Sequence, residues 1–226
     1  MGFWPVTKKV VKDSDIILLI LDVRMPELSI NRNLEEMASF YEKKVIYVFN
    51  KIDLVSSIYL EFVKSKFRNA FFVSGTKNIG INDLKRDLLV LAKRMKIKSP
   101  KIGVVGYPNV GKSAIINALA KRARAKVAST AGTTKGIQWI RVGDLLILDS
   151  PGVVPFDDSE LMLGIMGAKN IEKIRNVEKV ALGIIKMLLN YDKSVLENCY
   201  EIKISDNEDF NIFEEIGKKK GFLLKG

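Results

Sequence analysis

The chain has 226 residues, of which 37 are Lys or Arg and 26 are Asp or Glu, so its formal net charge is +11. The chain has one cysteine (Cys199) and no histidine. This composition excludes disulfide frameworks, zinc sites built from several thiolates, histidine metal sites and catalysis by a Ser-His or Cys-His pair. The longest apolar run, at 16–21, has six residues, whereas a membrane-spanning helix needs roughly 20. No apolar leader opens the chain, so we expect a cytoplasmic protein without membrane contact.

Four short apolar runs predict strands that are buried on both faces, as in a parallel sheet. They lie at 16–22, 45–50, 70–74 and 102–106. Helices are expected between and after them, at 33–42, 57–67, 82–95 and 112–120. Two further strands, at 137–142 and 145–149, predict a hairpin that turns at Gly143-Asp144. Strands that alternate with helices indicate an α/β fold with a mostly parallel sheet.

The expected helix at 82–95 has the clearest periodic pattern. Its apolar residues recur every three or four positions, at Leu84, Leu88, Leu91 and Met95. This spacing predicts one buried face, and Asn82 is the expected N-cap.

The character of the chain changes after residue 156. The remaining part is mainly helical, with helices expected at 160–166, 177–190 and 210–218. We therefore expect an α/β domain over 1–156 and a small helical domain over 157–226, the second being a candidate for RNA binding.

The positive charge is concentrated in one stretch. Residues 85–126 hold 12 basic residues and one acidic residue, which accounts for the whole excess of +11. The basic residues form two clusters, Lys93, Arg94, Lys96, Lys98 and Lys101, then Lys121, Arg122, Arg124 and Lys126. Such a field attracts polyanions and makes their binding sensitive to salt, which favours RNA contact. A solvated lysine-rich surface is the alternative interpretation.

A phosphate-binding loop follows the strand at 102–106. The segment from Gly106 to Ser113 reads GYPNVGKS and matches G-x-x-x-x-G-K-[ST], between a strand and a helix as that motif requires. Lys112 is expected to reach the outer phosphates and the Ser113 hydroxyl to ligate Mg²⁺, while the helix N-terminus adds its positive dipole. The residues expected to hold the phosphates are Asn109, Val110, Gly111, Lys112, Ser113 and Ala114.

The base is indicated by Asn50-Lys51-Ile52-Asp53, which ends the strand at 45–50, where ligands bind in doubly wound sheets. A carboxylate accepts two hydrogen bonds, and the N1–H and N2–H₂ edge of guanine offers two donors that adenine lacks. Asp53 is therefore expected to select guanine. Asn50 is expected to contact N7 and the stem of Lys51 to lie over the base.

Three further segments complete the predicted site. Ser74, Gly75 and Thr76 follow the third strand and are similar to a Ser-Ala-Lys-type loop whose backbone N–H faces the guanine O6. Asp149-Ser150-Pro151-Gly152 ends the hairpin; Asp149 is expected to hold Mg²⁺ through water and the Gly152 N–H to sense the γ-phosphate. In Ala131-Gly132-Thr133-Thr134-Lys135, Thr134 is the candidate switch threonine that closes on Mg²⁺ and joins the catalytic set.

These five motifs resemble those of Ras-like GTPases, but their order is permuted, because Asn50 precedes Lys112. The order is similar to that of the circularly permuted GTPases of the YlqF/YawG group, over roughly residues 14–156. Asp22-Val23-Arg24-Met25-Pro26 is similar to the Asp-Ala-Arg-x-Pro signature of that group. The resemblance implies a permuted Ras-like P-loop domain that acts as a GTP-dependent switch in assembly of the large ribosomal subunit, with ribosomal RNA as its partner.

The sequence also bears on hydrolysis. Val153 stands where Ras has a water-orienting glutamine, and the chain has no histidine to replace it, so turnover is expected to be slow for the isolated protein. Asn109 is similar to the P-loop asparagine of potassium-activated GTPases, which implies that it holds K⁺ against the phosphates and takes a catalytic role with Lys112.

Alternative functions keep part of this interpretation. The partner of the GTP-dependent switch could be another RNA or a protein, or the chain could be a guanine-nucleotide sensor that does not hydrolyse. An ATPase or small-molecule kinase that shares only the P-loop is disfavoured by Asn50 and Asp53.

Overall fold

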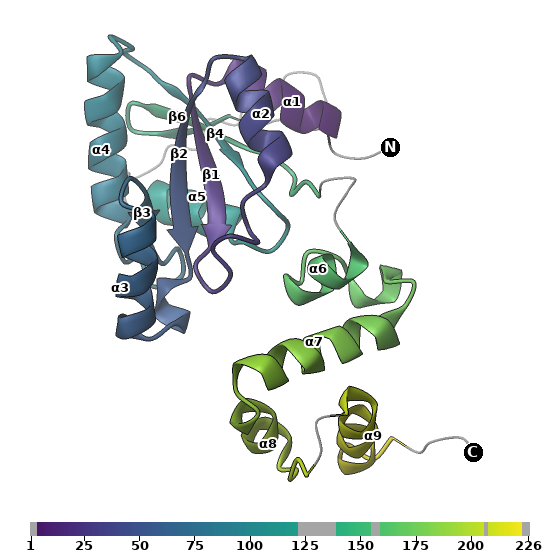
Figure 1. Ribbon diagram of the computed structural model, residues 1–226. Coiled ribbons are helices and arrows are strands. Elements are labelled where there is room, and N and C mark those ends of the chain that lie inside the picture. The colour runs from purple at the N-terminus through teal and green to yellow at the C-terminus, as the bar shows by residue number, and fades with distance from the viewer. Residues whose placement is uncertain (1–3, 122–138, 155–158, 206–207, 223–226) are drawn as a thin grey trace. The chain divides into compact units, whose positions relative to one another are not determined.

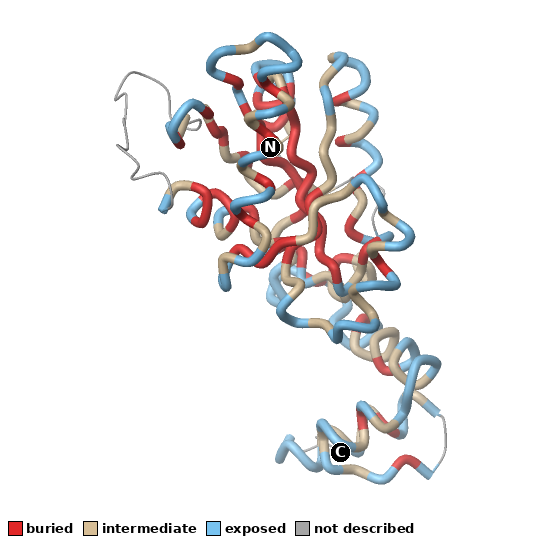
Figure 2. The backbone as a smooth tube through the Cα atoms, turned by 90° about the vertical axis from the view of Figure 1, so that its left-hand side faces the viewer, coloured by how far each residue is buried: buried red, intermediate tan, exposed pale blue. Residues whose placement is uncertain are grey.

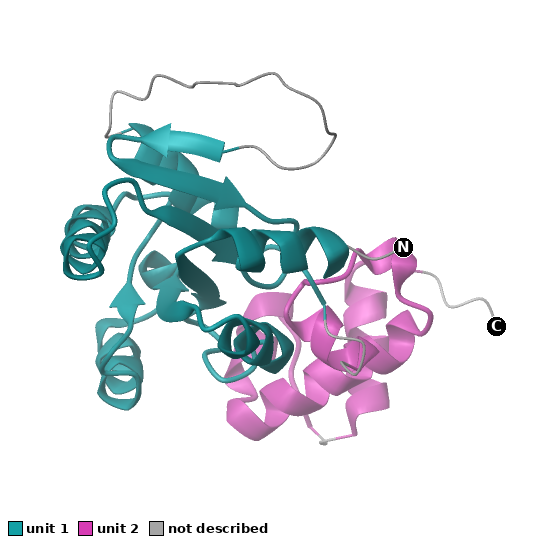
Figure 3. Cartoon of the chain, turned by 90° about the horizontal axis from the view of Figure 1, so that it is seen from above, with its two compact units in different colours: residues 1–156 teal, residues 157–226 magenta. Residues whose placement is uncertain are grey.

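In a computed structural model, residues 4–121, 139–154, 159–205 and 208–222 of the chain are described. The chain divides into two compact units, residues 1–156 and 157–226 (Figure 3). No helix in these described ranges combines the length and the apolar character needed to span a membrane.

The first unit is built on a six-stranded sheet with the order β3-β2-β1-β4-β6-β5 (Figure 1). All neighbouring strands are parallel except the antiparallel pair β5–β6, which is the predicted hairpin. The strands are β1 (Ile16–Asp22), β2 (Lys44–Asn50), β3 (Phe71–Phe72), β4 (Lys101–Val105), β5 (Trp139–Val142) and β6 (Leu145–Asp149). The predicted α/β fold with a mostly parallel sheet is confirmed.

Helices cover both faces of this sheet. They are α1 (Trp4–Asp13), α2 (Arg32–Phe40), α3 (Ser57–Lys66), α4 (Ile81–Arg94) and α5 (Lys112–Lys121), with the short 3₁₀ helix η1 (Ile52–Leu54) after β2. Helices α1, α2 and α3 share a core cluster with alternate residues of β1, while α5 contacts β5 and β6 and α4 contacts α5. Every residue of β1 is buried as a result, and buried residues follow the strands through the unit (Figure 2).

Some local predictions for this unit were wrong. The helix α1 was missed, although Trp4, Thr7 and Val10 share one helical face and Pro5 suits a first turn. The N-cap of α4 is Gly80, with a φ of 71°, and not Asn82, which lies inside the helix. Strand β3 has two residues instead of five, because the chain turns and Ser74 pairs with Ile79.

The second unit is helical, as expected. It contains α6 (Glu160–Ile165), the 3₁₀ helix η2 (Ile171–Lys173), α7 (Val177–Tyr191), α8 (Ser194–Tyr200) and α9 (Asp209–Lys219). The short α8 was not predicted; its Leu196 joins a small core with Ile185, Ile204 and Ile212. Helices α6 and α7 pack closely, since a side chain at Gly164 would collide with Val180.

Candidate nucleotide-binding site

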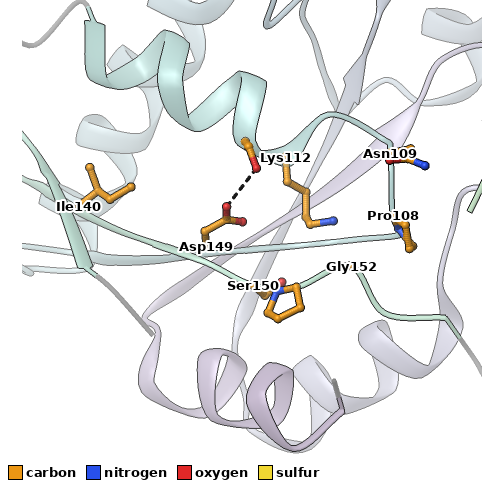
Figure 4. A pocket seen from close by; sticks show the side chains of 9 residues that line it. Pro108, Asn109, Lys112, Ile140, Asp149, Ser150 and Gly152 are labelled. Carbon is orange, nitrogen blue, oxygen red and sulfur yellow. Dashed lines mark hydrogen bonds between the residues drawn. The ribbon is translucent and has the colours of Figure 1, made fainter. Parts of the chain in front are cut away.

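The predicted motifs meet at one edge of the sheet. Strands β1, β2, β4 and β6 are mutually parallel, so the loops that follow them share the edge at which doubly wound sheets bind ligands. A cavity of about 640 Å³ opens there (Figure 4). It is lined by Pro108, Asn109, Lys112, Ser113, Ile140, Asp149, Ser150, Pro151 and Gly152.

The P-loop joins β4 to α5, and its glycines are required by close backbone approaches. At Gly106, with a φ of 147°, a Cβ would lie 2.5 Å from the carbonyl oxygen of Ile20. At Gly111, with a φ of 96°, a Cβ would collide with the side chain of Asn50. The loop therefore wraps tightly at the N-terminus of α5, where backbone N–H groups and the helix dipole favour phosphate.

Lys112 is held inside this loop. Its side chain faces the cavity (Figure 4), and the residue is 7% exposed. Its Nζ donates to the carbonyl oxygens of Tyr107 (2.7 Å) and Gly106 (3.3 Å). Burial lowers the pKa of Lys112 to about 8, against the opposing charge of Asp149. The ammonium group is thus poorly solvated, and a bound phosphate would favour its charged form.

Asp149 faces Lys112 from the end of β6. Its Oδ2 accepts from the Ser113 hydroxyl at 3.2 Å, the dashed line in Figure 4. Its Oδ1 is buried and has no hydrogen-bond partner among the described residues. Burial raises the pKa of Asp149, although the Ser113 hydrogen bond and the Lys112 charge oppose this shift.

These residues fit Mg²⁺, which proteins bind through one or two oxygen ligands together with waters and substrate phosphates. Asp149 and Ser113 supply a carboxylate and a hydroxyl beside the P-loop. The buried Oδ1 of Asp149 has no hydrogen-bond partner among the described residues, as expected for an oxygen that binds a cation or a water. Among the described residues there is no group of three or more His, Cys, Asp or Glu that would form a metal site independent of phosphate.

Asn50 links the segments predicted to recognise the base to the P-loop. Its Nδ2 donates to the Val110 carbonyl oxygen at 2.9 Å, and its Oδ1 accepts from the Gly75 N–H at 3.0 Å. Gly75 lies so close to α5 that a Cβ there would be 2.9 Å from the Ile115 nitrogen. Asn50 therefore uses both polar ends of its side chain to fasten two loops, a role beyond the N7 contact expected from the sequence.

The other residues predicted for the base site lie in the turn after β2 and in the loop that contains Gly75. Asp53 is exposed in the first turn of η1, and no hydrogen bond or ion pair of its carboxylate occurs within the described part of the chain. Ser74 and Thr76 hydroxyls are 3.2 Å apart, and Ser74 Oγ also accepts from the Lys77 N–H. The loop 74–76 is thus ordered by its own side chains, with the Gly75 backbone next to Asn50.

The Asp-Val-Arg-Met-Pro segment is connected to the predicted base site through Lys51. The Lys51 ammonium donates to Asp22 Oδ2 at 2.8 Å, and Arg24 donates to the same carboxylate at 3.0 and 2.8 Å. Burial raises the pKa of Asp22, but the hydrogen bonds from Arg24 and Lys51 outweigh it, so the pKa is lowered. Nothing in the sequence indicated that Asp22 would hold Lys51.

The segment after Asp149 packs against the P-loop. Ser150 donates to the Val104 carbonyl oxygen at 2.7 Å, and a Cβ at Gly152 would lie 2.6 Å from Pro108. Val153 is 2% exposed and belongs to the core cluster, so its side chain points into the protein interior and has no means of orienting water. Thr134, the candidate switch threonine, lies outside the described residues, as do Arg122, Arg124 and Lys126 of the second basic cluster.

The chain matches known families and proteins. Residues 101–218 match the family described as 50S ribosome-binding GTPase, and residues 4–158 match the RsgA GTPase family. The uncharacterized GTP-binding protein MJ1464 of Methanocaldococcus jannaschii is 39% identical, over 98% of this chain and 59% of that protein. Ribosome biogenesis GTPase A of Bacillus licheniformis is 31% identical, over 98% of this chain and 83% of that protein.

A nucleolar relative and a solved structure give further matches. Nucleolar GTP-binding protein 2 of Neurospora crassa is 33% identical, over 99% of this chain and 37% of that protein. The chain thus spans 59% and 37% of the lengths of two of these relatives. The GDP-bound structure of TM YlqF shares the fold, with a TM-score of 0.52, 21% identity, and coverage of 95% of this chain and 94% of that chain.

Proposed function

We propose a function from the premise that this chain belongs to the circularly permuted GTPases of the YlqF group, which follows from its family matches and its relative in Bacillus licheniformis. The chain binds GTP and GDP and hydrolyses GTP to GDP and phosphate. The observation that carries this proposal is the pair of hydrogen bonds in which the Asn50 side chain donates to the Val110 carbonyl oxygen and accepts from the Gly75 N–H. They join a guanine-type base loop to a P-loop on one sheet edge, although the motifs are permuted in the chain.

In this mechanism the residues of the chain position the phosphates and balance their charge. Lys112 leaves the Tyr107 and Gly106 carbonyl oxygens and donates to the outer phosphates. Asp149 and Ser113 would hold Mg²⁺, which neutralises charge on the phosphates when it is bound. Water attacks the γ-phosphorus, the bond to the bridging oxygen breaks with its electron pair left on GDP, and the proton lost by the water passes to the phosphate product or to solvent. The apolar side chain of Val153 does not orient that water, so turnover by the isolated chain is slow.

Asn109 is the proposed source of stimulation by K⁺. It lines the phosphate cavity at a left-handed φ of 61°, and its side-chain oxygen would hold K⁺ beside the phosphates, a charge-neutralising role. The GTPase rate at equal ionic strength should be higher in KCl than in NaCl. An Asn109→Ala variant should lose the difference, and equal rates for the unaltered chain would refute the role.

The nucleotide itself is tested by binding. Labelled GDP should bind and should be displaced by GTP but not by ATP. Displacement by ATP would favour an ATPase or kinase. GDP and GTP binding without turnover, in K⁺ and with the partner present, would favour a non-hydrolysing sensor.

We propose that the partner is RNA of the large ribosomal subunit, and that the protein acts in the cytoplasm. The proposal is supported by the family description, by the name of the Bacillus licheniformis relative, and by the first basic cluster. Its five residues, Lys93, Arg94, Lys96, Lys98 and Lys101, are exposed, and none has an ion pair among the described residues.

The position of this cluster suits a second ligand. Lys101 begins β4, whereas the P-loop follows the end of the same strand, so the cluster lies at the opposite end of β4 from the nucleotide site. Lys93, Lys96 and Lys98 line a cavity of about 470 Å³, and among its described lining residues Asp144 is the one carboxylate. RNA bound there would leave the nucleotide site open.

Cosedimentation with large ribosomal subunits in K⁺ buffer tests the partner. Binding with a non-hydrolysable GTP analogue and release with GDP are expected. A triple Lys93→Glu, Lys96→Glu, Lys98→Glu variant should bind more weakly, with a salt dependence of log K smaller by about 2 to 3, since each lost phosphate contact removes about 0.7 to 0.9. A Lys218→Glu, Lys219→Glu, Lys220→Glu variant tests instead whether basic residues of the helical unit contribute to this binding. No binding in either nucleotide state would favour another RNA or a protein partner.

A further inference from the structure

The two residues after Asp149-Ser150-Pro151-Gly152 are held by side chains from the beginning of the chain. The Trp4 indole donates from Nε1 to the Val154 carbonyl oxygen at 3.1 Å. The Asn31 amide donates from Nδ2 to the Val153 carbonyl oxygen at 3.4 Å. Consecutive carbonyl groups of one segment are therefore bound by donors at the N-terminal ends of two different helices.

Both donors are themselves fixed. Asn31 is fully buried and is the N-cap of α2, where its Oδ1 accepts from the Leu34 N–H at 3.2 Å. Its amide thus caps a helix with one end and binds Val153 with the other. Trp4 begins α1 and packs against the same core cluster that contains the Val153 side chain.

The segment is also attached on its other side. The Val153 N–H donates to the Gly106 carbonyl oxygen of the P-loop at 3.3 Å. The peptide group before Val153 thus binds the P-loop, and the peptide group after it binds the Asn31 side chain at the start of α2. Gly152, immediately before it, is in close contact with Pro108 and lines the phosphate cavity. Holding Val153 and Val154 in place also restricts where Gly152 lies.

We propose that Trp4 and Asn31 are positioning residues for the γ-phosphate-sensing segment: by binding the carbonyl groups of Val154 and Val153 they keep Gly152 at the phosphate cavity, and so they favour GTP over GDP. This inference rests on the proposed function and on the expectation from the sequence that the Gly152 N–H meets the γ-phosphate. Ordering a free backbone segment opposes binding through lost conformational entropy, and a segment that is already held loses less. GDP has no γ-phosphate, so its affinity does not depend on the position of the Gly152 N–H.

The test uses variants that remove the donors and little else. Trp4→Phe retains an aromatic ring without its N–H. Asn31→Ser retains an N-cap acceptor but is too short to reach Val153. Asn176→Ser is the matched control, because Asn176 caps α7 through the Lys179 N–H at 2.9 Å in the other unit. The dissociation constants of GDP and of a non-hydrolysable GTP analogue are measured for the whole chain with Mg²⁺ and K⁺.

In the Trp4→Phe, Asn31→Ser double variant, the dissociation constant of the analogue should rise about fivefold to tenfold, as expected for two hydrogen bonds. The GDP constant should stay within about twofold, and Asn176→Ser should leave both unchanged. A purely structural role would weaken both nucleotides by one factor, and that result or an unchanged ratio would overturn the inference. If the double variant does not fold, Trp4→Phe alone decides, with an expected shift in the ratio of about twofold to threefold.

The same experiment separates this inference from the function on which it rests. If the unaltered chain binds neither nucleotide, the proposed function is refuted and the inference falls with it. If the unaltered chain binds both and the variants keep its preference, only the positioning role of Trp4 and Asn31 is refuted.

Discussion

Asn50 Nδ2 donates to the carbonyl oxygen of Val110 across 2.9 Å, and so the end of β2 is joined to the P-loop. Asn50→Asp keeps the size of the side chain and its acceptor for the Gly75 N–H but removes this donor. We expect GDP affinity to fall about tenfold to a hundredfold, since an unsatisfied buried polar group costs about 1–3 kcal/mol. Equilibrium dialysis with labelled GDP measures the loss.

The control for that change is Asn176→Asp, because Asn176 is exposed and caps α7 through its side-chain oxygen, which aspartate also supplies. It should leave GDP affinity unchanged. Unchanged affinity in Asn50→Asp as well would show that the two loops are held in place without this bond.

Asp53 should decide which base is bound. Its carboxylate is exposed in the first turn of η1, and carboxylate oxygens suit the two donors of the guanine edge. Asp53→Asn replaces one acceptor by a donor, which matches the carbonyl oxygen of xanthine at the same position. GDP affinity should fall at least about a hundredfold, because a site built on hydrogen bonds rejects a mismatched partner strongly, while xanthosine diphosphate should bind.

Competition between the two diphosphates for the variant measures this change. Asp209→Asn, in the first turn of α9, is the matched control and should keep its preference for GDP. If Asp53→Asn also keeps that preference, the base is read by other groups.

The parts of the fold that were predictable are those with strong local patterns. Strand β1 was predicted with its observed bounds because every residue in it is buried, so its apolar run is uninterrupted from Ile16 to Leu21. Strand β6 was also predicted with its observed bounds, 145–149. The edge strand β3 pairs on one side only, and its apolar run continued into residues that turn away. Gly80 was missed as a helix cap because its positive φ, and not a side chain, starts α4.

The site divides in the same way. The P-loop is a contiguous motif, so its position between β4 and α5 was predictable from spacing. The bond from Trp4 to Val154 joins residues 150 positions apart, and the bond from Lys51 to Asp22 depends on the parallel register that places Asp22 opposite Asn50. Neither contact leaves a local pattern, because each arises from tertiary packing of separate strands and helices.

Lys112 should make nucleotide binding dependent on pH. Burial lowers its pKa to about 8 in the ligand-free protein, and bound phosphates raise it because they favour the charged form. Binding at pH 8.5 must therefore take up protons, and GDP affinity should fall as the pH rises above about 8. Titration calorimetry in two buffers of different protonation enthalpy measures the uptake, which should grow between pH 7 and 8.5. An uptake that does not grow would mean that Lys112 is already fully charged before nucleotide binds.

Val153 gives the most direct contrast with the Ras arrangement. A Val153→Gln change restores the residue type that orients water in Ras, yet the Val153 side chain is 2% exposed and packs in the core cluster. The glutamine amide would be buried without a partner, which costs about 1–3 kcal/mol, and it would point away from the phosphate cavity. The variant should therefore unfold at a lower temperature and hydrolyse GTP no faster than the unaltered chain. Val195→Gln, at a position that is 41% exposed, should leave the unfolding temperature nearly unchanged. A clear rise in turnover by Val153→Gln would mean that this segment leaves the core when GTP binds, and that its attachment to α1 and α2 breaks in that state.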